Sequence, residues 1–163
     1  YTTSRMLAEN CLKVVAAKLG RDLGRSITDQ RHLAGCDIQD LSSFLFTVQR
    51  DNRDFSGPTL EYLSRNYGTE YAEVLALARD DRTKAEVLNA DGEIMAEVTY
   101  AIRQEMAKTL SDIVMRRTGI GTLGNPGEMV LRMVAELAAK ELAWDNARME
   151  EEIAATMTLL TLP

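Results

Sequence analysis

Cysteine and histidine are scarce in this chain, which excludes several kinds of protein. Two cysteines, Cys11 and Cys36, are too few for the disulfide framework of a small secreted domain. Because His32 is the only histidine, neither a Cys2His2 zinc site nor a bundle di-iron site can be assembled. We expect Cys11 to pack as a small hydrophobe, and Cys36 and His32 to be unreactive loop residues.

Positive charge and long apolar runs are also missing. Nineteen Lys and Arg against 25 Asp and Glu give a net charge of −6, which argues against a broad nucleic-acid surface or an electrostatic membrane patch. No apolar run approaches the roughly 20 residues that span a bilayer, and residues 1–5 do not resemble a signal peptide. A cytoplasmic protein is the expectation.

What is present is a globular, helical composition. The 163 residues are 45% hydrophobic and 27% charged. A chain of this length and composition can form one hydrophobic core without a disulfide bond or a metal ion to stabilise it. No segment alternates as a strand does, and helical periodicity recurs along the chain. The sequence therefore predicts an all-α fold, a bundle of five to six helices without a significant sheet.

Helix boundaries are predicted by glycine, proline and capping residues. A first helix is expected over 4–20, with the hydroxyl of Thr3 or Ser4 as its cap. After a weakly patterned stretch with one short helix near Leu41, a helix is expected from Pro58 to Tyr67. Thr69 is expected to cap a further helix that ends at about residue 80. Asn125 and Asp145 are expected to cap the last two helices.

The cleanest helical period lies over residues 94–118. Its apolar stripe predicts one long helix with these residues in the core: Val98, Ile102, Met106, Leu110 and Ile113. Glu97, Glu105 and Asp112 recur near one side of this helix. We expect these carboxylates to be solvated or paired at the rim of the core, with Arg116 and Lys108 one turn from Asp112. The run 150–152 is expected to be a solvated helix face.

A glycine pattern at 119–124, Gly-Ile-Gly-Thr-Leu-Gly, matches the dinucleotide fingerprint GxGxxG. That fingerprint works only between a strand and the helix that opens within it, because the pyrophosphate then meets the helix N-terminus. Here a helix is expected before it, so we interpret the pattern as a turn between helices. No nucleophile, base and orienting group can be grouped from the sequence, so we assign no catalytic and no metal residue.

The stretch 97–118, EVTYAIRQEMAKTLSDIVMRRT, resembles a helix in the C-terminal domain of the aerobic FAD-dependent glycerol-3-phosphate dehydrogenases, which reads E-V-x-Y-A-x-x-x-E-x-A-x-T-x-x-D-x-x-x-R-R-T. Arg65-Asn66-Tyr67-Gly68 is similar to the family's R-x-Y-G turn, and Trp144-Asp145 to its W-[DS] helix break. Residues 1–9 are similar to the segment that closes the flavin-binding domain, although Tyr1 and Ser4 depart from it.

The resemblance implies a C-terminal piece of an enzyme that oxidises glycerol 3-phosphate to dihydroxyacetone phosphate on FAD. It implies a helix over 1–24 that belongs to the end of the upstream FAD-binding domain, a connector over 25–57 and a C-terminal helical domain over 58–163. Thr2 and Thr3 would then approach the FAD of the full-length enzyme, and the isolated chain would hold no cofactor and be inactive. The expected partner is that upstream domain, while a homo-oligomer and a peripheral membrane contact of the whole enzyme stay open. The alternative is a stand-alone all-α interaction or oligomerisation module.

Overall fold

The computed structural model describes residues 3–161, and its regular structure is helical, as the sequence predicted. Among these residues no strand occurs, and a single antiparallel bridge joins Val87 to Ile94. Within residues 3–161, seven α-helices have eight or more residues, against the five to six expected. The α-helices are α1 (Ser4–Leu19), α2 (Leu41–Asp51), α3 (Gly57–Tyr67), α4 (Tyr71–Asp80), α5 (Ala96–Arg103), α6 (Leu110–Asp112), α7 (Glu128–Leu142) and α8 (Asn146–Leu160). Short 3-10 turns η1 (Gly68–Glu70) and η2 (Arg82–Ala85) flank α4, and a π-helical turn η3 (Ile113–Arg117) follows α6.

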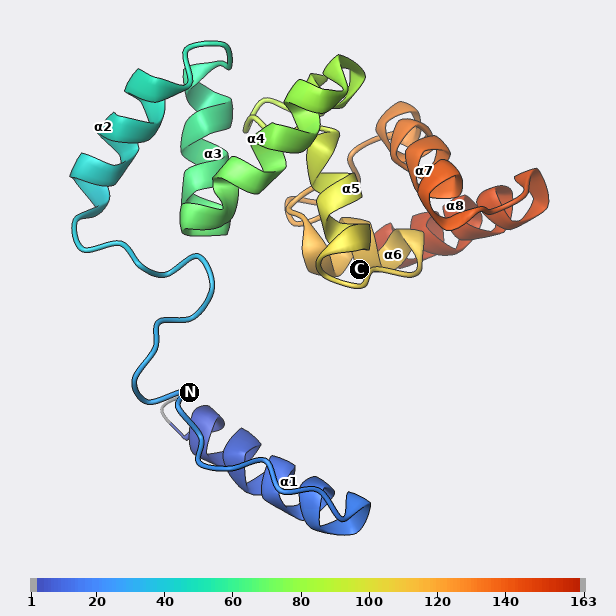
Figure 1. Cartoon of the computed structure of the whole chain (residues 1–163). Coiled ribbons are helices and arrows are strands. Elements are labelled where there is room, and N and C mark those ends of the chain that lie inside the picture. Colours follow the sequence, from blue (N-terminus) through green and yellow to red (C-terminus); the bar gives the residue numbers. More distant parts are fainter. Residues whose placement is uncertain (1–2, 162–163) are drawn as a thin grey trace.

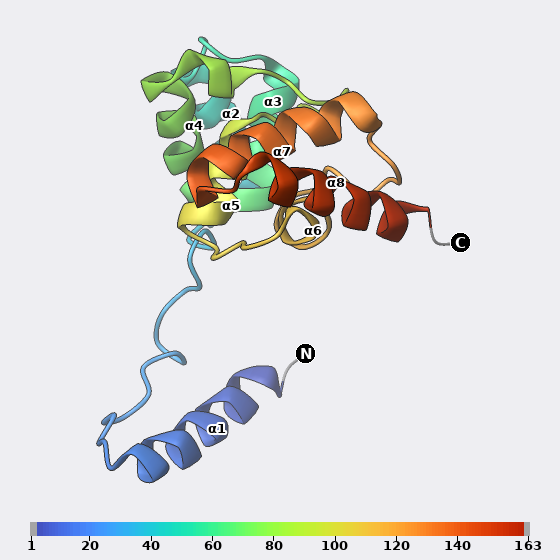
Figure 2. The ribbon, with the colours of Figure 1, turned by 90° about the vertical axis from the view of Figure 1, so that its right-hand side faces the viewer.

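Helix α1 lies apart from the other helices, at the end of an extended connector over 20–40 (Figures 1 and 2). Its apolar side chains, among them Leu7 and Leu19, are exposed, and only Ala16 is buried. The prediction that Cys11 packs as a hydrophobe is wrong for this structure, because no other described helix covers that face and the thiol is exposed. Figures 1 and 2 show the connector joining α1 to the body of the protein at α2.

The remaining helices form two hydrophobic clusters that share α5. The first cluster joins α2, α3 and α4, and the second joins α6, η3, α7 and α8. Helix α5 lies between α4 and α7 (Figure 1). Ala96 and Tyr100 pack into the first cluster and Val98 and Ile102 into the second, because helical periodicity turns these pairs to different sides.

The predicted long helix over 94–118 is wrong: the segment breaks after Arg103 and resumes at Leu110. Met106 has a left-handed backbone (φ 60°) and a side chain that is 74% exposed, so it is not part of the buried stripe. The other four members of the stripe are buried, as predicted. A capping box starts the new helix, because the Thr109 hydroxyl accepts the Asp112 N–H and the Asp112 carboxylate accepts the Thr109 N–H.

Other predicted helix ends are partly confirmed. Asp145 caps α8 by accepting the Arg148 N–H at 2.8 Å, and Pro58 lies in the first turn of α3. Asn125 does not cap α7, which begins only at Glu128; its side chain instead accepts the Gly127 N–H in a tight turn at 2.9 Å. Thr69 is not a cap either, because η1 continues α3 directly toward α4.

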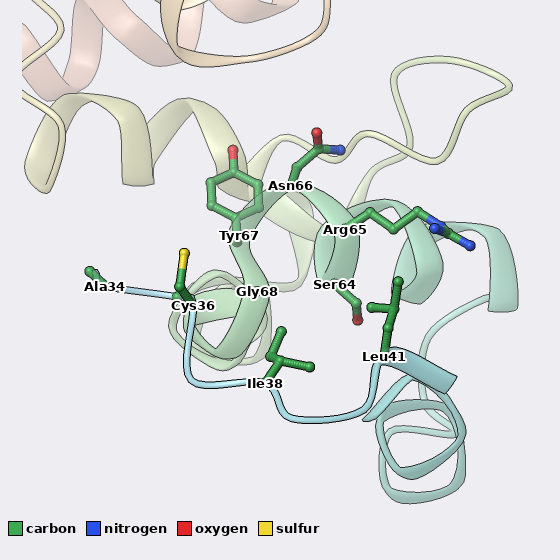
Figure 3. Close-up of a pocket in the computed structure, with 10 residues that line it drawn as sticks. Ala34, Cys36, Ile38, Leu41, Ser64, Arg65, Asn66, Tyr67 and Gly68 are labelled. Atoms are coloured by element: carbon green, nitrogen blue, oxygen red, sulfur yellow. The ribbon is translucent and has the colours of Figure 1, made fainter. Parts of the chain in front are cut away.

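The connector is anchored to the end of α3 by a backbone contact between two glycines. The Thr69 N–H donates to the Gly35 carbonyl at 3.0 Å, and a Cβ at Gly68 would lie 1.8 Å from that oxygen. Gly68 has φ 55° and ψ −132°, a region open essentially to glycine alone. A cavity of about 380 Å³ lies beside this contact, with Ile38 on the connector side and the α3 end opposite (Figure 3).

Candidate functional site

A second, polar cavity of about 250 Å³ opens beside the C-terminal half of α3. Four chain segments meet there: α3, the first turn of α5, the break after α5, and the end of η3 with the glycine-rich turn. Asn66 and Tyr67 line both this cavity and the one beside the connector. The lining residues are Tyr62, Asn66, Tyr67, Glu97, Glu105, Arg116, Arg117, Thr118, Gly119 and Thr122.

Glu97 lies at the buried wall of the cavity with 1% of its surface exposed. One carboxylate oxygen accepts the Ile94 N–H at 2.8 Å and the other accepts the Tyr67 hydroxyl at 3.0 Å. Burial raises the pKa of Glu97 to about 8; the Ile94 bond opposes this and the charge of Glu93 adds to it. The prediction that Glu97 is solvated at the rim is wrong, because α5 is buried on both sides between two clusters.

Glu105 reaches the cavity because the helix is broken beside it. Its Oε2 atom is buried and accepts no hydrogen bond from the described residues. Burial raises the pKa of Glu105, while the positive charge of Arg117 lowers it and the charge of Glu70 raises it. The next residue, Met106, holds the strained left-handed backbone, a conformation that costs roughly 1–3 kcal/mol in a residue other than glycine. The break therefore places the Glu105 carboxylate at the cavity, whereas a continuous helix would direct this side chain elsewhere.

Close packing beside the cavity explains why the first residue of the GxGxxG pattern, Gly119, is a glycine. Tyr62 donates its hydroxyl to Glu93 Oε1 at 2.6 Å, and Glu93 is 1% exposed. A Cβ at Gly119 would lie 2.3 Å from that hydroxyl oxygen. Gly119 is thus required by close packing, and the segment 119–124 is a turn after η3, as predicted, with no strand before it. It does not fit the pyrophosphate of a dinucleotide.

The two arginines at the end of η3 differ in their partners. Arg116 pairs with Asp112 at 3.0 Å, as the spacing predicted. Lys108 meets Asp112 through its backbone N–H at 3.1 Å and not through its ammonium group. Arg117 is exposed and forms no ion pair with the described residues, although its charge acts on Glu105. Both arginines line the cavity and are exposed, and Arg117 is the one without an ion-pair partner among the described residues.

Glu97 makes stability depend on pH. Because its folded pKa of about 8 exceeds the ordinary 4.5, unfolding between these pH values releases a proton and becomes easier as pH rises. We expect the free energy of unfolding to fall from about pH 5 to about pH 8, by about 1 kcal/mol per pH unit where steepest. Glu97→Gln should flatten this slope, leaving the smaller contribution of Glu105, which has the same sign.

Urea unfolding of both proteins at pH 5, 6, 7 and 8 measures this slope. Glu150→Gln is a matched control, because Glu150 is exposed and its pKa is lowered by Arg132. The stabilisation that the Glu150 carboxylate provides is lost only as the pH falls below the ordinary pKa range of a carboxyl group. The Glu150→Gln variant should therefore keep the parent's slope between pH 5 and pH 8. A parent curve that is flat over this range would contradict the expectation.

The other candidate residues lie away from this cavity. Thr3 precedes α1 and is exposed; its side chain makes no capping bond, contrary to the prediction, and its carbonyl accepts the Leu7 N–H. Thr2 lies outside the described residues. His32 and Asp37 approach at 3.9 Å, both exposed. Of the run 150–152, Glu152 is buried and accepts the Leu110 N–H at 2.9 Å, so it is not part of a solvated face.

The described residues contain neither a metal-ligand cluster nor a membrane-spanning helix. Over residues 3–161, no group of three or more His, Cys, Asp or Glu residues is placed to hold a metal ion. In the same part of the chain, no helix combines the length and the apolar character that crossing a bilayer requires.

Comparison with known families identifies residues 26–149. This range matches the family described as the C-terminal domain of alpha-glycerophosphate oxidase. The chain belongs to this family. The match includes the connector beyond residue 26 and every residue that lines the two cavities. No solved structure matches the chain.

Several curated proteins have sequences that align with nearly the whole of this chain. The probable mitochondrial glycerol-3-phosphate dehydrogenase of Dictyostelium discoideum is 29% identical over 157 residues, covering 94% of this chain and 24% of that protein. Glycerol-3-phosphate dehydrogenase 2 of Mycobacterium tuberculosis is 28% identical, with coverages of 94% and 27%. The mitochondrial enzyme of Bos taurus is 28% identical, with coverages of 94% and 22%. The chain thus spans about a quarter of the length of these relatives.

The structure brings the family-like segments together. Glu97, Glu105 and the pair Arg116–Arg117, from the segment 97–118, meet Tyr67 of the R-x-Y-G turn at the polar cavity. Sequence reasoning placed these segments in the family but did not predict that they meet, and it missed Tyr62, Asn66 and Glu93. One signal was available: Thr109-x-x-Asp112 is a capping-box pattern, which favours a helix start at Leu110.

Proposed function

We propose that this chain is the C-terminal helical cap of an FAD-dependent enzyme that oxidises glycerol 3-phosphate to dihydroxyacetone phosphate, and that the chain itself performs no catalysis. The observation that carries the proposal is the family match over 26–149, together with relatives about four times longer that are named glycerol-3-phosphate dehydrogenases. FAD would be held by the part of the enzyme that precedes Tyr1. The glycine turn 119–124 does not supply a phosphate site here.

The exposed face of α1 supports an upstream partner within the same polypeptide. Leu7, Val14 and Leu19 are 71%, 57% and 66% exposed, and α1 packs against no other helix among the described residues. Burying such side chains contributes roughly 1.5–3 kcal/mol each. We therefore assign residues 1–24 to the end of the FAD-binding domain. Helix α2 contributes Val48 to the first cluster and joins the helical cap.

The purified chain tests the proposal directly. We expect it to be colourless after gel filtration and to show no glycerol 3-phosphate oxidation with an artificial electron acceptor, because a flavin needs a long preformed cleft. The gene sequence before Tyr1 should encode a G-x-G-x-x-G strand–turn–helix unit. Stoichiometric yellow flavin on the isolated chain, or an upstream region without that unit, would contradict the proposal. The alternative, a stand-alone interaction module, is then favoured if the chain self-associates through α1.

Thr2 and Thr3 are the residues of this chain that we propose to contact FAD in the full-length enzyme. A helix N-terminus carries free N–H groups and partial positive charge, which stabilise an anion. In the full-length enzyme, Thr3→Val should shift the flavin redox potential or FAD retention. Since the Thr3 side chain makes no capping bond, we expect little loss of stability. An unchanged potential and unchanged retention would remove Thr3 from the site, and Thr47→Val on the exposed face of α2 is the control.

A further inference from the structure

The end of α3 is the place where the connector, and with it α1, is attached to the other helices. The attachment is the hydrogen bond from the Thr69 N–H to the Gly35 carbonyl at 3.0 Å. Between the end of α1 and this attachment lies the segment 20–34, which spans at most roughly 50 Å even when fully extended. A domain that contains α1 is therefore confined near the end of α3. A short flexible tether of this kind raises the effective concentration of that domain there to roughly millimolar.

Apolar side chains remain uncovered at the same place. Leu33 is 78% exposed and Leu41, the first residue of α2, is 44% exposed. Ile38 and Leu41 form the apolar wall of the cavity of about 380 Å³, opposite the end of α3 (Figure 3). Leu33 is held beside this wall by a turn in which the Cys36 N–H donates to the Leu33 carbonyl at 3.0 Å. We call the surface made by Leu33, Ile38, Leu41 and Ser64 the connector face.

Ser64 is the buried polar residue of the connector face. It is 1% exposed, and its hydroxyl oxygen is buried with no hydrogen-bond partner among the described residues. Its side chain points from α3 toward Ile38 and Leu41 (Figure 3). Buried hydroxyls in folded proteins are nearly always hydrogen-bonded, because burial removes their bonds to bulk water. The cavity therefore suits a group that is apolar along Ile38 and Leu41 and brings a hydrogen-bonding atom to Ser64.

A charged rim continues the connector face on the side of the polar cavity. The two cavities adjoin, because Asn66 and Tyr67 line both of them. Arg117 lines the polar cavity, is exposed, and forms no ion pair with the described residues. Its guanidinium would pair with a carboxylate of a partner through charge-assisted hydrogen bonds. An apolar centre with a polar, solvent-accessible rim is the usual arrangement of a protein–protein interface.

We propose that the connector face is the surface on which the domain upstream of Tyr1 docks, with an apolar side chain of that domain in the cavity and a polar group bound to Ser64. The tether favours this occupant, because it joins α1 to this face. The length of the relatives favours it too: the chain covers 24% of the Dictyostelium protein, and the matched family is a C-terminal domain. The proposal rests on the proposed function only in requiring a domain before Tyr1, and it is independent of what that domain binds or oxidises.

Alkylation of Cys36 in the full-length enzyme and in the isolated chain tests the docking. This thiol is exposed and lines the cavity, so its reaction with iodoacetamide at mildly alkaline pH reports whether the cavity is covered. Mass spectrometry of the peptide should show labelling at least about tenfold slower in the full-length enzyme, because a covered thiol reacts only when the interface opens. The thiol of Ala155→Cys is the control and should react equally fast in both proteins, because Ala155 is exposed on α8, which packs against α6 and α7.

Two variants test the contacts separately. Leu33→Glu places a charge on the connector face and should restore most of the Cys36 labelling rate in the full-length enzyme. Met129→Glu, at a side chain of α7 that is 76% exposed, should leave the protection of Cys36 unchanged. Ser64→Ala removes the unpartnered hydroxyl, so the isolated chain should be at least as stable as the parent, while Cys36 of the full-length enzyme should label several-fold faster. A less stable isolated Ser64→Ala chain would show that the hydroxyl is bound within the chain, and would contradict the assignment of Ser64.

The labelling rates separate this proposal from the flavoenzyme proposal. If Cys36 reacts equally fast in the full-length enzyme and in the isolated chain, the docking face is wrong, even if that enzyme holds FAD and oxidises glycerol 3-phosphate. If labelling of the isolated chain slows as its concentration rises, a second copy occupies the face, and the proposal is overturned. If Cys36 is protected in a full-length protein that holds no flavin, the docking face stands and only the enzyme assignment fails.

Discussion

Leu110→Ala should lower the free energy of unfolding by about 2–5 kcal/mol. Leu110 is fully buried in the second cluster, where α6, α7 and α8 meet, so truncation leaves a cavity among helices that cannot all close on it. Its backbone N–H is bound to Glu152, which holds the main chain in place and limits relaxation. The cost should therefore lie in the upper part of that range.

Urea unfolding followed by circular dichroism measures this loss at a single pH. Leu123→Ala is the matched control, because it deletes the same atoms from a side chain that is 86% exposed. Its stability should change by less than about 0.5 kcal/mol. A loss below about 1 kcal/mol for Leu110→Ala would show that the break in the predicted long helix leaves Leu110 outside the packed core.

Gly68→Ala should detach the connector from the end of α3. The new Cβ would collide with the Gly35 carbonyl oxygen, and the backbone of residue 68 would be strained even without that contact. The hydrogen bond from Thr69 to Gly35 should break, and strain alone should cost roughly 1–3 kcal/mol. We expect a lower melting temperature together with faster proteolysis over residues 20–40.

Two measurements distinguish detachment from general unfolding. Limited proteolysis reports the connector, and hydrogen exchange at the Thr69 amide reports the lost bond. Gly57→Ala serves as control, because this glycine starts α3 with an ordinary backbone and no atom lies within 4 Å of its Cβ position. Unchanged cleavage of the connector in Gly68→Ala would contradict the anchoring role of the glycine pair.

The polar cavity beside α3 depends on the break in the chain after Arg103. If the helix ran unbroken from 94 to 118, Glu105 would follow Glu97 by about two turns on its own helix. The break instead brings Glu105, Arg117 and Gly119 back toward α3. The capping box at Thr109 and the left-handed Met106 are the local devices that produce it.

The sequence by itself determined the helical class, the capping of α8 by Asp145, the turn at 119–124 and the family. These depend on local physics: periodicity decides which face is apolar, and short polar side chains satisfy orphan backbone N–H groups wherever the chain leaves them. The same helical periodicity predicted that residues such as Val98 and Ile113 are buried. Family membership needed only the order of residues in the segment 97–118.

Only the tertiary structure decided which polar residues meet. Glu97 is buried because α5 packs between two clusters, a fact that its own periodicity does not contain. Met106 is exposed because a long-range bond from Leu110 to Glu152 and a capping box outweigh the helical pattern of its segment. Gly68 and Gly119 are required by atoms 33 and 57 residues away in the chain, at Gly35 and Tyr62. Contacts of this kind are set by packing between elements, which one-dimensional patterns do not encode.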